Sequence, residues 1–227
     1  MSVEVTPVFC NENNMANYAY IVKSPKTTVI IDAAEANPII NELEKQRLTP
    51  SHILTTHHHY DHVGGNIALK EKYNLKIIAP AKEFTKVPAA DIEAKENTKL
   101  TIKDLTFDII PAPGHTLGHI LYYLKAENLL FTGDVLFNLC IGGLFEGTSQ
   151  QMAESLAKIK TLPDNTLIFP GHEYTRAALT PDLITNPDFA PYLKKMFRRE
   201  NGELAPTTLW EEKRFNPYLI TDNLKDL

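Results

Sequence analysis

The sequence predicts an α/β fold in which two β-sheets pack face to face between outer helices. Short apolar runs alternate with helical patterns in the first half of the 227 residues, which is typical of a sheet covered by helices. The second half repeats that outline. From about Thr175 the chain becomes proline-rich, with helical fragments. We therefore expect a main domain over residues 1–174 and a short helical C-terminal region, 175–227, packed on it.

In the first half, β-branched and apolar residues form short runs that predict strands. These runs are residues 3–9, 18–23, 27–32, 51–56 and 75–80. Between the third and fourth run, an apolar stripe predicts a helix with Asn37 as N-cap and Pro38 as its first residue. A second helix is expected over residues 64–74.

The second half is expected to contain the second sheet. Residues 98–113 resemble a hairpin, and residues 119–125 and 128–134 form two further apolar runs. A helix is expected over 149–160, with Thr148 or Ser149 as its cap. The run at 165–172 is expected to be the last strand.

Composition and charge exclude several classes of protein. The formal net charge of -5 argues against a nucleic-acid or membrane-surface binder, which usually needs a positive face. Two cysteines are too few for a disulfide framework. The start has no secretory signal pattern, and no apolar run approaches the roughly 20 residues of a membrane span. We expect a monomeric cytoplasmic protein.

The stretch "HHHYDH" contains four of the eight histidines within six positions, directly after an apolar strand. In an extended segment residues two apart share a side, so His57 and His59 point together while His58 points away. Asp61 and His62 follow as the chain turns, and both can face the same point. Imidazole nitrogens and carboxylate oxygens suit zinc or another first-row divalent metal.

Three later segments each place one more metal-type residue at the end of an apolar strand or in a tight turn. They are "PAPGHTLGH" with His115, "LLFTGD" with Asp134 and "LIFPGH" with His172. Folds of the α/β type build sites at the carboxyl ends of strands. Seven candidate ligands are too many for one zinc but suit two ions, with the Asp134 carboxylate as the shared ligand.

The motifs "THHHYDHVGGN", "PGHTLGH", "FTGD" and "PGHEYT" resemble, in this order, those of the metallo-β-lactamase superfamily. "THHHYDH", "LFEGT" and "GHEYT" are similar to its glyoxalase II branch, the hydroxyacylglutathione hydrolases. The resemblance implies an αββα sandwich with two metal ions. It assigns His57, His59 and His115 to one ion, Asp61, His62 and His172 to the other, and Asp134 to both.

Such a site favours thioester hydrolysis. Two ions about 3.5–4 Å apart can hold a hydroxide between them and polarise a carbonyl. A thiolate, with a pKa of about 8.5 for its thiol, leaves without help from an acid. The resemblance implies conversion of S-D-lactoylglutathione to D-lactate and glutathione, with zinc as the first choice of metal and iron or manganese as alternatives. The roles of His58 and His119 stay open between packing and orienting a ligand.

The chain departs from the glyoxalase II pattern where that pattern binds glutathione. Gly143 stands where a lysine or arginine is expected and Phe145 where tyrosine is common, although Tyr174 is kept. Lys225 aligns with a basic position near the C-terminus. We therefore expect a high KM for the glutathione thioester that depends little on salt.

Three alternatives remain. The enzyme could act on another thioester or a lactone, or it could be a mono-iron, sulfur dioxygenase-like oxidoreductase. A non-catalytic binding protein would need missing ligands, and the sequence has all seven.

Overall fold

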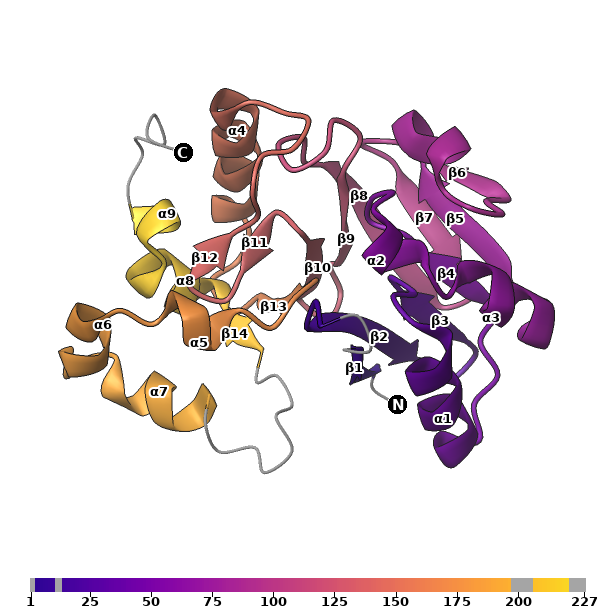
Figure 1. The fold of residues 1–227 in the computed structure, drawn as a ribbon, viewed down its shortest axis with the longest axis horizontal. Helices are drawn as coiled ribbons and strands as arrows, with labels where there is room; N and C mark the ends of the chain where they lie inside the picture. The colour runs from indigo at the N-terminus through magenta and orange to yellow at the C-terminus, as the bar shows by residue number, and fades with distance from the viewer. Residues whose placement is uncertain (1–2, 11–13, 197–205, 221–227) are drawn as a thin grey trace.

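The computed structural model describes residues 3–10, 14–196 and 206–220, and in this part of the chain it contains two stacked six-stranded sheets (Figure 1). The strands of the first sheet follow one another in chain order. They are β1 (Glu4–Cys10), β2 (Asn17–Lys23), β3 (Thr28–Ile31), β4 (His52–Leu54), β5 (Lys76–Pro80) and β6 (Ile92–Ala94). Strands β3 to β6 run parallel, so their carboxyl ends meet at one edge of the sheet.

The second sheet has the order β14-β13-β10-β9-β8-β7. Its strands are β7 (Lys99–Ile102), β8 (Leu105–Pro111), β9 (Ile120–Leu124), β10 (Leu129–Gly133), β13 (Leu167–Pro170) and β14 (Thr207–Thr208). Strands β10 and β13 are parallel, whereas the other neighbours are antiparallel. A two-stranded ribbon, β11 (Leu136–Phe137) and β12 (Cys140–Ile141), follows β10.

Helices cover the outer face of each sheet, so the αββα prediction is confirmed (Figure 1). The first half contains α1 (Ala36–Gln46), α2 (Tyr60–Val63), α3 (Asn66–Tyr73) and the 3₁₀ helix η1 (Ala81–Lys86). The second contains α4 (Ser149–Lys160), α5 (Thr175–Ala178), α6 (Pro181–Thr185), α7 (Ala190–Met196), α8 (Leu209–Phe215) and α9 (Pro217–Ile220).

Three apolar layers hold the sandwich together. The layer between the sheets includes Tyr20, Phe107 and Phe131. In the second layer, Ile39 of α1 and Leu69 of α3 pack on the first sheet. In the third layer, Met152 and Leu156 of α4 and Leu209 of α8 pack on the second sheet. Because the central strands β2, β3, β9 and β10 are buried on both faces, they read as continuous apolar runs in the sequence, whereas β1, β6, β7 and β8 also carry exposed residues.

Two helix starts differ in how well the sequence predicted them. The prediction of Asn37 as N-cap of α1 is wrong, since Glu35 takes that position without a side-chain hydrogen bond. The helix begins at Ala36, and Pro38 still lies in the first turn, where its missing N–H is not needed. For α4 the prediction is confirmed, because Thr148 forms a capping box with Gln151.

The run at 165–172 is not the last strand. Thr207 and Thr208 form β14, which pairs antiparallel with the first two residues of β13. The region after Thr175 therefore contributes a sheet edge as well as helices. Among the described residues, none of the helices is long and apolar enough to cross a membrane.

Candidate metal centre

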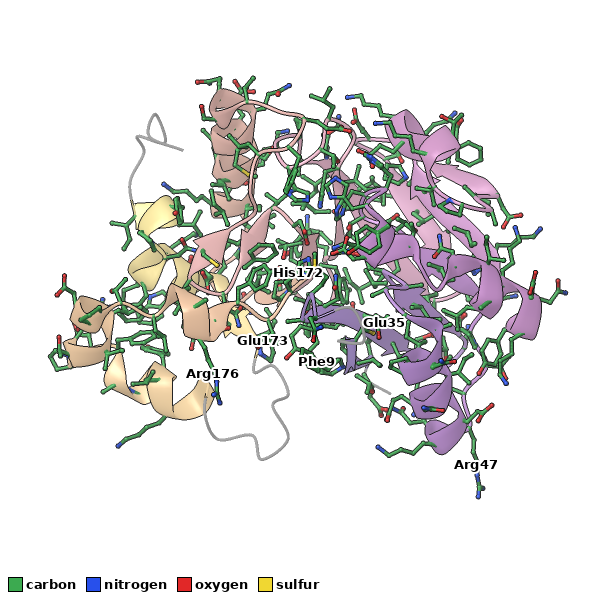
Figure 2. The ribbon with its side chains drawn as sticks, in the orientation of Figure 1. Phe9, Glu35, Arg47, His172, Glu173 and Arg176 are labelled. Carbon is green, nitrogen blue, oxygen red and sulfur yellow. The ribbon has the colours of Figure 1, made fainter. Side chains whose placement is uncertain are left out.

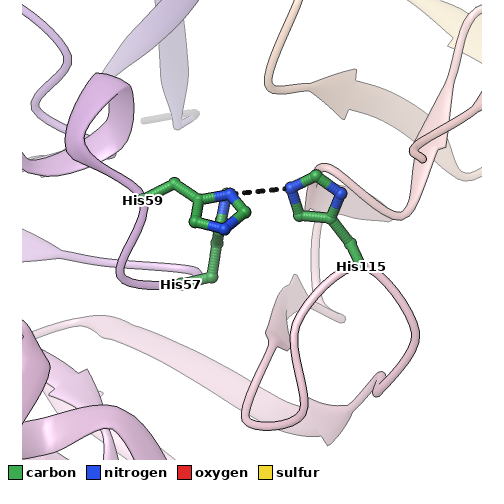
Figure 3. A group of neighbouring side chains, drawn as sticks. All are labelled: His57, His59 and His115. Atoms are coloured by element: carbon green, nitrogen blue, oxygen red, sulfur yellow. Dashed lines mark hydrogen bonds between the residues drawn. The ribbon is translucent and has the colours of Figure 1, made fainter. Parts of the chain in front are cut away.

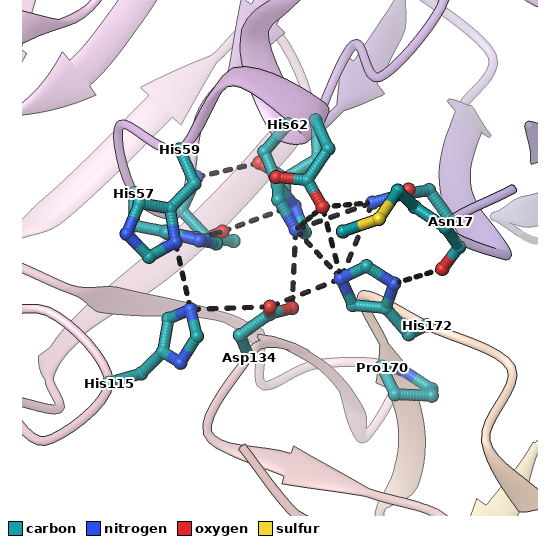
Figure 4. Close-up of polar contacts among 12 residues, drawn as sticks. Asn17, His57, His59, His62, His115, Asp134, Pro170 and His172 are labelled. Carbon is teal, nitrogen blue, oxygen red and sulfur yellow. Dashed lines mark hydrogen bonds and ion pairs between the residues drawn. The ribbon is translucent and has the colours of Figure 1, made fainter. Parts of the chain in front are cut away.

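The seven predicted metal ligands lie together between the carboxyl ends of strands from both sheets (Figure 4). Within each of three overlapping groups, the candidate ligand atoms all lie within 4.8 Å of one another. The first group is His57, His59 and His115, and the second group is Asp61, His62 and His172. A linking set, His57, His62 and Asp134, overlaps both. Figure 2 shows His172 near the middle of the molecule, whereas Arg47 and Arg176 point outward.

The first group consists of three histidines from two loops (Figure 3). His57 and His59 follow β4, and His115 lies in the turn between β8 and β9. The Nδ1 atom of His59 lies 2.9 Å from Nε2 of His115. The Nε2 atom of His57 is buried and has no hydrogen-bond partner among the described residues.

The second group contains Asp61, His62 and His172. The Nε2 atoms of His62 and His172 lie 3.3 Å apart, and Nε2 of His172 lies 3.4 Å from Oδ2 of Asp61. Asn17, at the start of β2, donates from its side-chain amide to the same Asp61 oxygen at 3.1 Å. The amide therefore fixes the direction of the carboxylate.

Asp134, directly after β10, lies between the two groups (Figure 4). Its Oδ2 atom is 3.3 Å from Nε2 of His115 and 3.1 Å from Nε2 of His172. Its Oδ1 atom is 3.2 Å from Nε2 of His62. One carboxylate thus reaches histidines of both groups.

Buried hydrogen bonds fix which nitrogen of each histidine faces the centre. The Nδ1–H of His115 donates to the carbonyl of Gly143 at 2.7 Å, and that of His172 donates to the carbonyl of Met15 at 2.7 Å. Each bond leaves Nε2 as the ring nitrogen that faces the cluster. Partners of this kind hold the ring and tautomer that a metal ion needs.

Asp32, which follows β3, orients ligands of both groups. Its carboxylate accepts the backbone N–H and the hydroxyl of Thr56, each at 2.7 Å, and Nδ1–H of His62 at 3.1 Å. Since the Thr56 hydroxyl donates to Asp32, its oxygen accepts Nδ1–H of His57 at 3.0 Å. One buried carboxylate therefore sets two ligand rings.

The environment keeps the first group neutral. Burial lowers the pKa of His57 well below its ordinary value and also lowers the pKa of His59 and His115. Neutral imidazole is the form that binds a metal ion.

The carboxylates draw positive charge to the second group. Burial alone would lower the pKa of His172, but contacts with Asp134 and Asp61 raise it to about 9. Contacts with Asp134 and Asp32 likewise raise the pKa of His62 despite its burial. This side of the cluster therefore attracts cations.

Gly171 makes room for the centre. A Cβ atom at this position would lie 2.3 Å from Oδ1 of Asp134 and 2.7 Å from Cε1 of His62. Such distances are far shorter than any normal contact, so a larger residue would move the shared carboxylate.

The donor set fits divalent metal ions. Neutral imidazoles and carboxylates are ligands of first-row divalent metals. A buried nitrogen without a partner, as in His57, costs free energy unless something binds it.

His58 and His119 lie outside the ligand groups, and both contact buried side chains close to the centre. Nδ1 of His58 contacts Glu83 at 2.9 Å, as expected for a side chain that points away from the centre. His119 stacks on His57, and its Nε2 accepts the backbone N–H of Asp134 at 3.1 Å. His119 thus contacts a ligand ring and the backbone of a ligand, whereas the hydrogen bond of the His58 side chain is to a carboxylate outside the ligand groups.

Three of the four predicted substrate-binding residues, Gly143, Phe145 and Tyr174, lie against the cluster. Phe145 is 73% exposed and sets its ring edge-to-face against His59 and His115. Tyr174 stacks on His172. Lys225 lies outside the described residues.

The sequence motifs did not identify Asp32, Thr56 or Asn17 as residues of the site. Asp32 carried a usable signal, because it follows a buried strand as Asp134 does. Thr56 and Asn17 carried none, since their roles depend on contacts with distant segments.

A sequence model of the metallo-beta-lactamase superfamily matches residues 14–172. The hydroxyacylglutathione hydrolase of Mesorhizobium japonicum is 40% identical over 226 residues, which cover 96% of this chain and 88% of that protein. The chain belongs to the metallo-β-lactamase superfamily and, within it, to the hydroxyacylglutathione hydrolase family. A second member, from Rhizobium meliloti, is 42% identical over 197 residues, with 85% and 77% of the two chains covered.

Solved structures of the superfamily share the fold. The BLEG-1 B3 metallo-beta-lactamase is similar with a TM-score of 0.76 and 26% identity, over 96% of this chain and all of that one. ETHE1 from Myxococcus xanthus has a TM-score of 0.72 and 26% identity, over 94% and 83%.

Proposed function

We propose that this protein is a metal-dependent thioester hydrolase that converts S-D-lactoylglutathione and water into D-lactate and glutathione. The observation that carries the proposal is the position of Asp134, whose carboxylate reaches His115 of one group and His172 of the other. A carboxylate in this position suits two divalent ions that share a ligand. Identity of about 40% to hydroxyacylglutathione hydrolases supports the substrate class.

In this proposal the chain provides two sets of ligands. His57, His59 and His115 would hold one ion, and Asp61, His62 and His172 the other, with Asp134 in contact with both. Two divalent ions, zinc as the first choice and iron or manganese as alternatives, would lower the pKa of water toward about 7 and polarise the thioester carbonyl.

The side chains around the cluster would contact the substrate. We assign this role to Phe145 and Tyr174, which lie against histidines of the first and second group respectively. The Gly143 and Lys225 positions would contact the thiol carrier. Because a thiolate is a good leaving group, with a pKa of about 8.5 for its thiol, no acid is required.

Enzyme kinetics and elemental analysis, measured on the same samples, test the proposal. We expect protein stripped by a chelator to lose activity on S-D-lactoylglutathione and to regain it with about two ions per chain. A panel of other thioesters and lactones, measured on the same samples, defines the substrate class. Failure to hydrolyse any glutathione thioester would contradict the proposal. One iron per chain with oxygen uptake would favour a sulfur dioxygenase-like reaction.

We further propose that the enzyme is a monomer of the cytoplasm. Sedimentation analysis of the purified protein tests the first part, and fractionation of the source cells tests the second. A stable dimer, or recovery outside the cytoplasm, would contradict the corresponding part.

A further inference from the structure

Glu83, in η1 after β5, lies behind the metal centre with its residue only 1% exposed. Each of its two carboxylate oxygens accepts two hydrogen bonds. Oε1 accepts the hydroxyl of Thr116 and, at 2.9 Å, the backbone N–H of Gly118. Oε2 accepts the backbone N–H of His58 at 2.7 Å and its Nδ1–H at 2.9 Å. An ionised carboxylate has about four such acceptor sites, so this one is saturated and is not itself a ligand.

The four donors belong to the two loops that supply the first group of ligands. His58 lies between His57 and His59, and Thr116 directly follows His115. Glu83 is 25 residues from His58 and 35 from Gly118 along the chain. A single buried side chain therefore joins the backbones of both loops next to all three ligands.

We propose that Glu83 is the positioning residue for the ion held by His57, His59 and His115, an inference that rests on the metal centre proposed above. It acts through the residues next to the ligands: the backbone N–H of His58 lies between His57 and His59, and the hydroxyl of Thr116 directly follows His115. Side chains that orient metal ligands change metal affinity by about 10–100-fold when they are replaced.

Gly118 provides an independent way to disturb the same contact. A Cβ atom at this position would lie 2.5 Å from Cγ of Glu83 and 2.9 Å from its Oε1. The backbone of Gly118 is not in the left-handed region, so alanine adds no backbone strain. Besides the collision with Glu83, the added Cβ would meet only Cβ of the preceding Lys82, at 2.9 Å, among the three nearest atoms. Gly118→Ala should displace the carboxylate while leaving its charge and hydrogen-bonding groups unchanged.

The test uses the full chain with Glu83→Gln, Gly118→Ala and, as control, Glu212→Gln. Glutamine keeps the shape of glutamate but directs an amide N–H₂ at two of the four donors, which leaves them unpaired. Glu212 is a buried carboxylate outside the metal centre that accepts the backbone N–H of Leu139. Each protein is stripped, loaded with Co²⁺, and titrated against a chromophoric chelator to obtain the affinity for each ion.

We expect Glu212→Gln to hold two ions, each with the affinity that it has in the wild type. Glu83→Gln and Gly118→Ala should weaken one ion by about 10–100-fold and leave the other near the wild-type value. Excess Co²⁺ should restore hydrolysis in both variants. A purely structural role would weaken both ions together, and that result, or unchanged affinity for both, would overturn the proposal.

Thermal unfolding of the stripped proteins checks that the variants fold. If Glu83→Gln does not fold, Gly118→Ala alone decides, because it retains the carboxylate. A wild type that holds two ions but hydrolyses no thioester would refute the proposed function, while the Co²⁺ affinities would still decide the role of Glu83. A wild type that binds no ion would overturn both.

Discussion

Two buried carboxylates, Asp134 and Glu212, behave in opposite ways in the two regions where they lie. Burial alone raises the pKa of both, because the charged form loses its hydration. For Asp134, the charges of His62 and His172 reverse this effect and hold the pKa well below its usual value. For Glu212, whose hydrogen-bond partners are neutral groups, burial dominates and raises the pKa to about 7.

The difference shows that burial by itself does not make a carboxylate a metal ligand. Asp134 is kept ionised by the imidazoles around it, so it is ready to bind a cation. Glu212 retains a proton up to about neutral pH and joins α8 to the turn between β11 and β12.

Asp134→Ala should have the largest effect, since it removes the carboxylate that reaches both ligand groups. Loss of about 4 kcal/mol of transition-state stabilisation corresponds to a fall of about a thousandfold in kcat/KM. The kcat/KM of thioester hydrolysis measures this fall, and elemental analysis of the same preparation gives the metal content. Glu212→Gln is the control. A variant that keeps two ions and activity within about tenfold would break the contrast.

Glu212 should make stability fall as pH rises. Its pKa is about 7 in the folded protein against 4.5 for the free group, so the folded state binds more protons between these values. The contribution is therefore fully present below about pH 4.5 and is lost by about pH 7, and it amounts to up to about 3 kcal/mol.

Urea unfolding of wild type and Glu212→Gln at pH 5 and pH 8 measures this effect as a difference between the two proteins, so other groups cancel. We expect the variant to gain stability relative to wild type at the higher pH. A difference that does not change with pH would mean that Glu212 is ionised throughout.

Gly171→Ala should disturb Asp134 without changing any ligand. The added Cβ would collide with Oδ1 of Asp134, so metal affinity should fall by about 10–100-fold. Competition with a chelator measures the metal affinity. Gly143→Ala is the matched control, because its Cβ would meet only Phe145, at an ordinary 3.5 Å. Equal affinities in the two variants would refute the close contact at Gly171.

Gly143→Lys should have the smallest effect, because the loop around it is open to solvent and its charges are screened. We expect the KM of wild type for S-D-lactoylglutathione to change little with ionic strength. The lysine should lower KM by about tenfold at low salt, since a hydrogen bond to a charged group contributes about 1.5 kcal/mol. Kinetics at low and high salt measure this, and a steep salt dependence in wild type would contradict it.

The sequence predicted the αββα fold because its central strands, such as β3 and β10, are buried on both faces and appear as uninterrupted apolar runs. It missed β14, whose two threonines form too short a run to stand out among helical fragments. It also placed the N-cap of α1 at Asn37, since the local pattern of Asn and Pro suits a helix start two residues later than the observed one.

The seven candidate ligands were found from the sequence alone because each follows a strand or a turn, and the rigid strands bring those positions to one edge. Their division into two groups with Asp134 shared came from the ligand count and the family resemblance rather than from local spacing, since His115 and His172 come from segments far apart in the chain. The orienting contacts of Asp32, Asn17 and Glu83 were decided only by tertiary structure.

The sequence by itself therefore determined the chemical type of the site: histidines and carboxylates, which local spacing is enough to mark. Only the tertiary structure decided which nitrogen of each ring faces the centre and which carboxylate is kept ionised. The reason is physical, because a tautomer or a pKa depends on the nearest hydrogen-bond partners and charges, and at this site most of them come from distant parts of the chain.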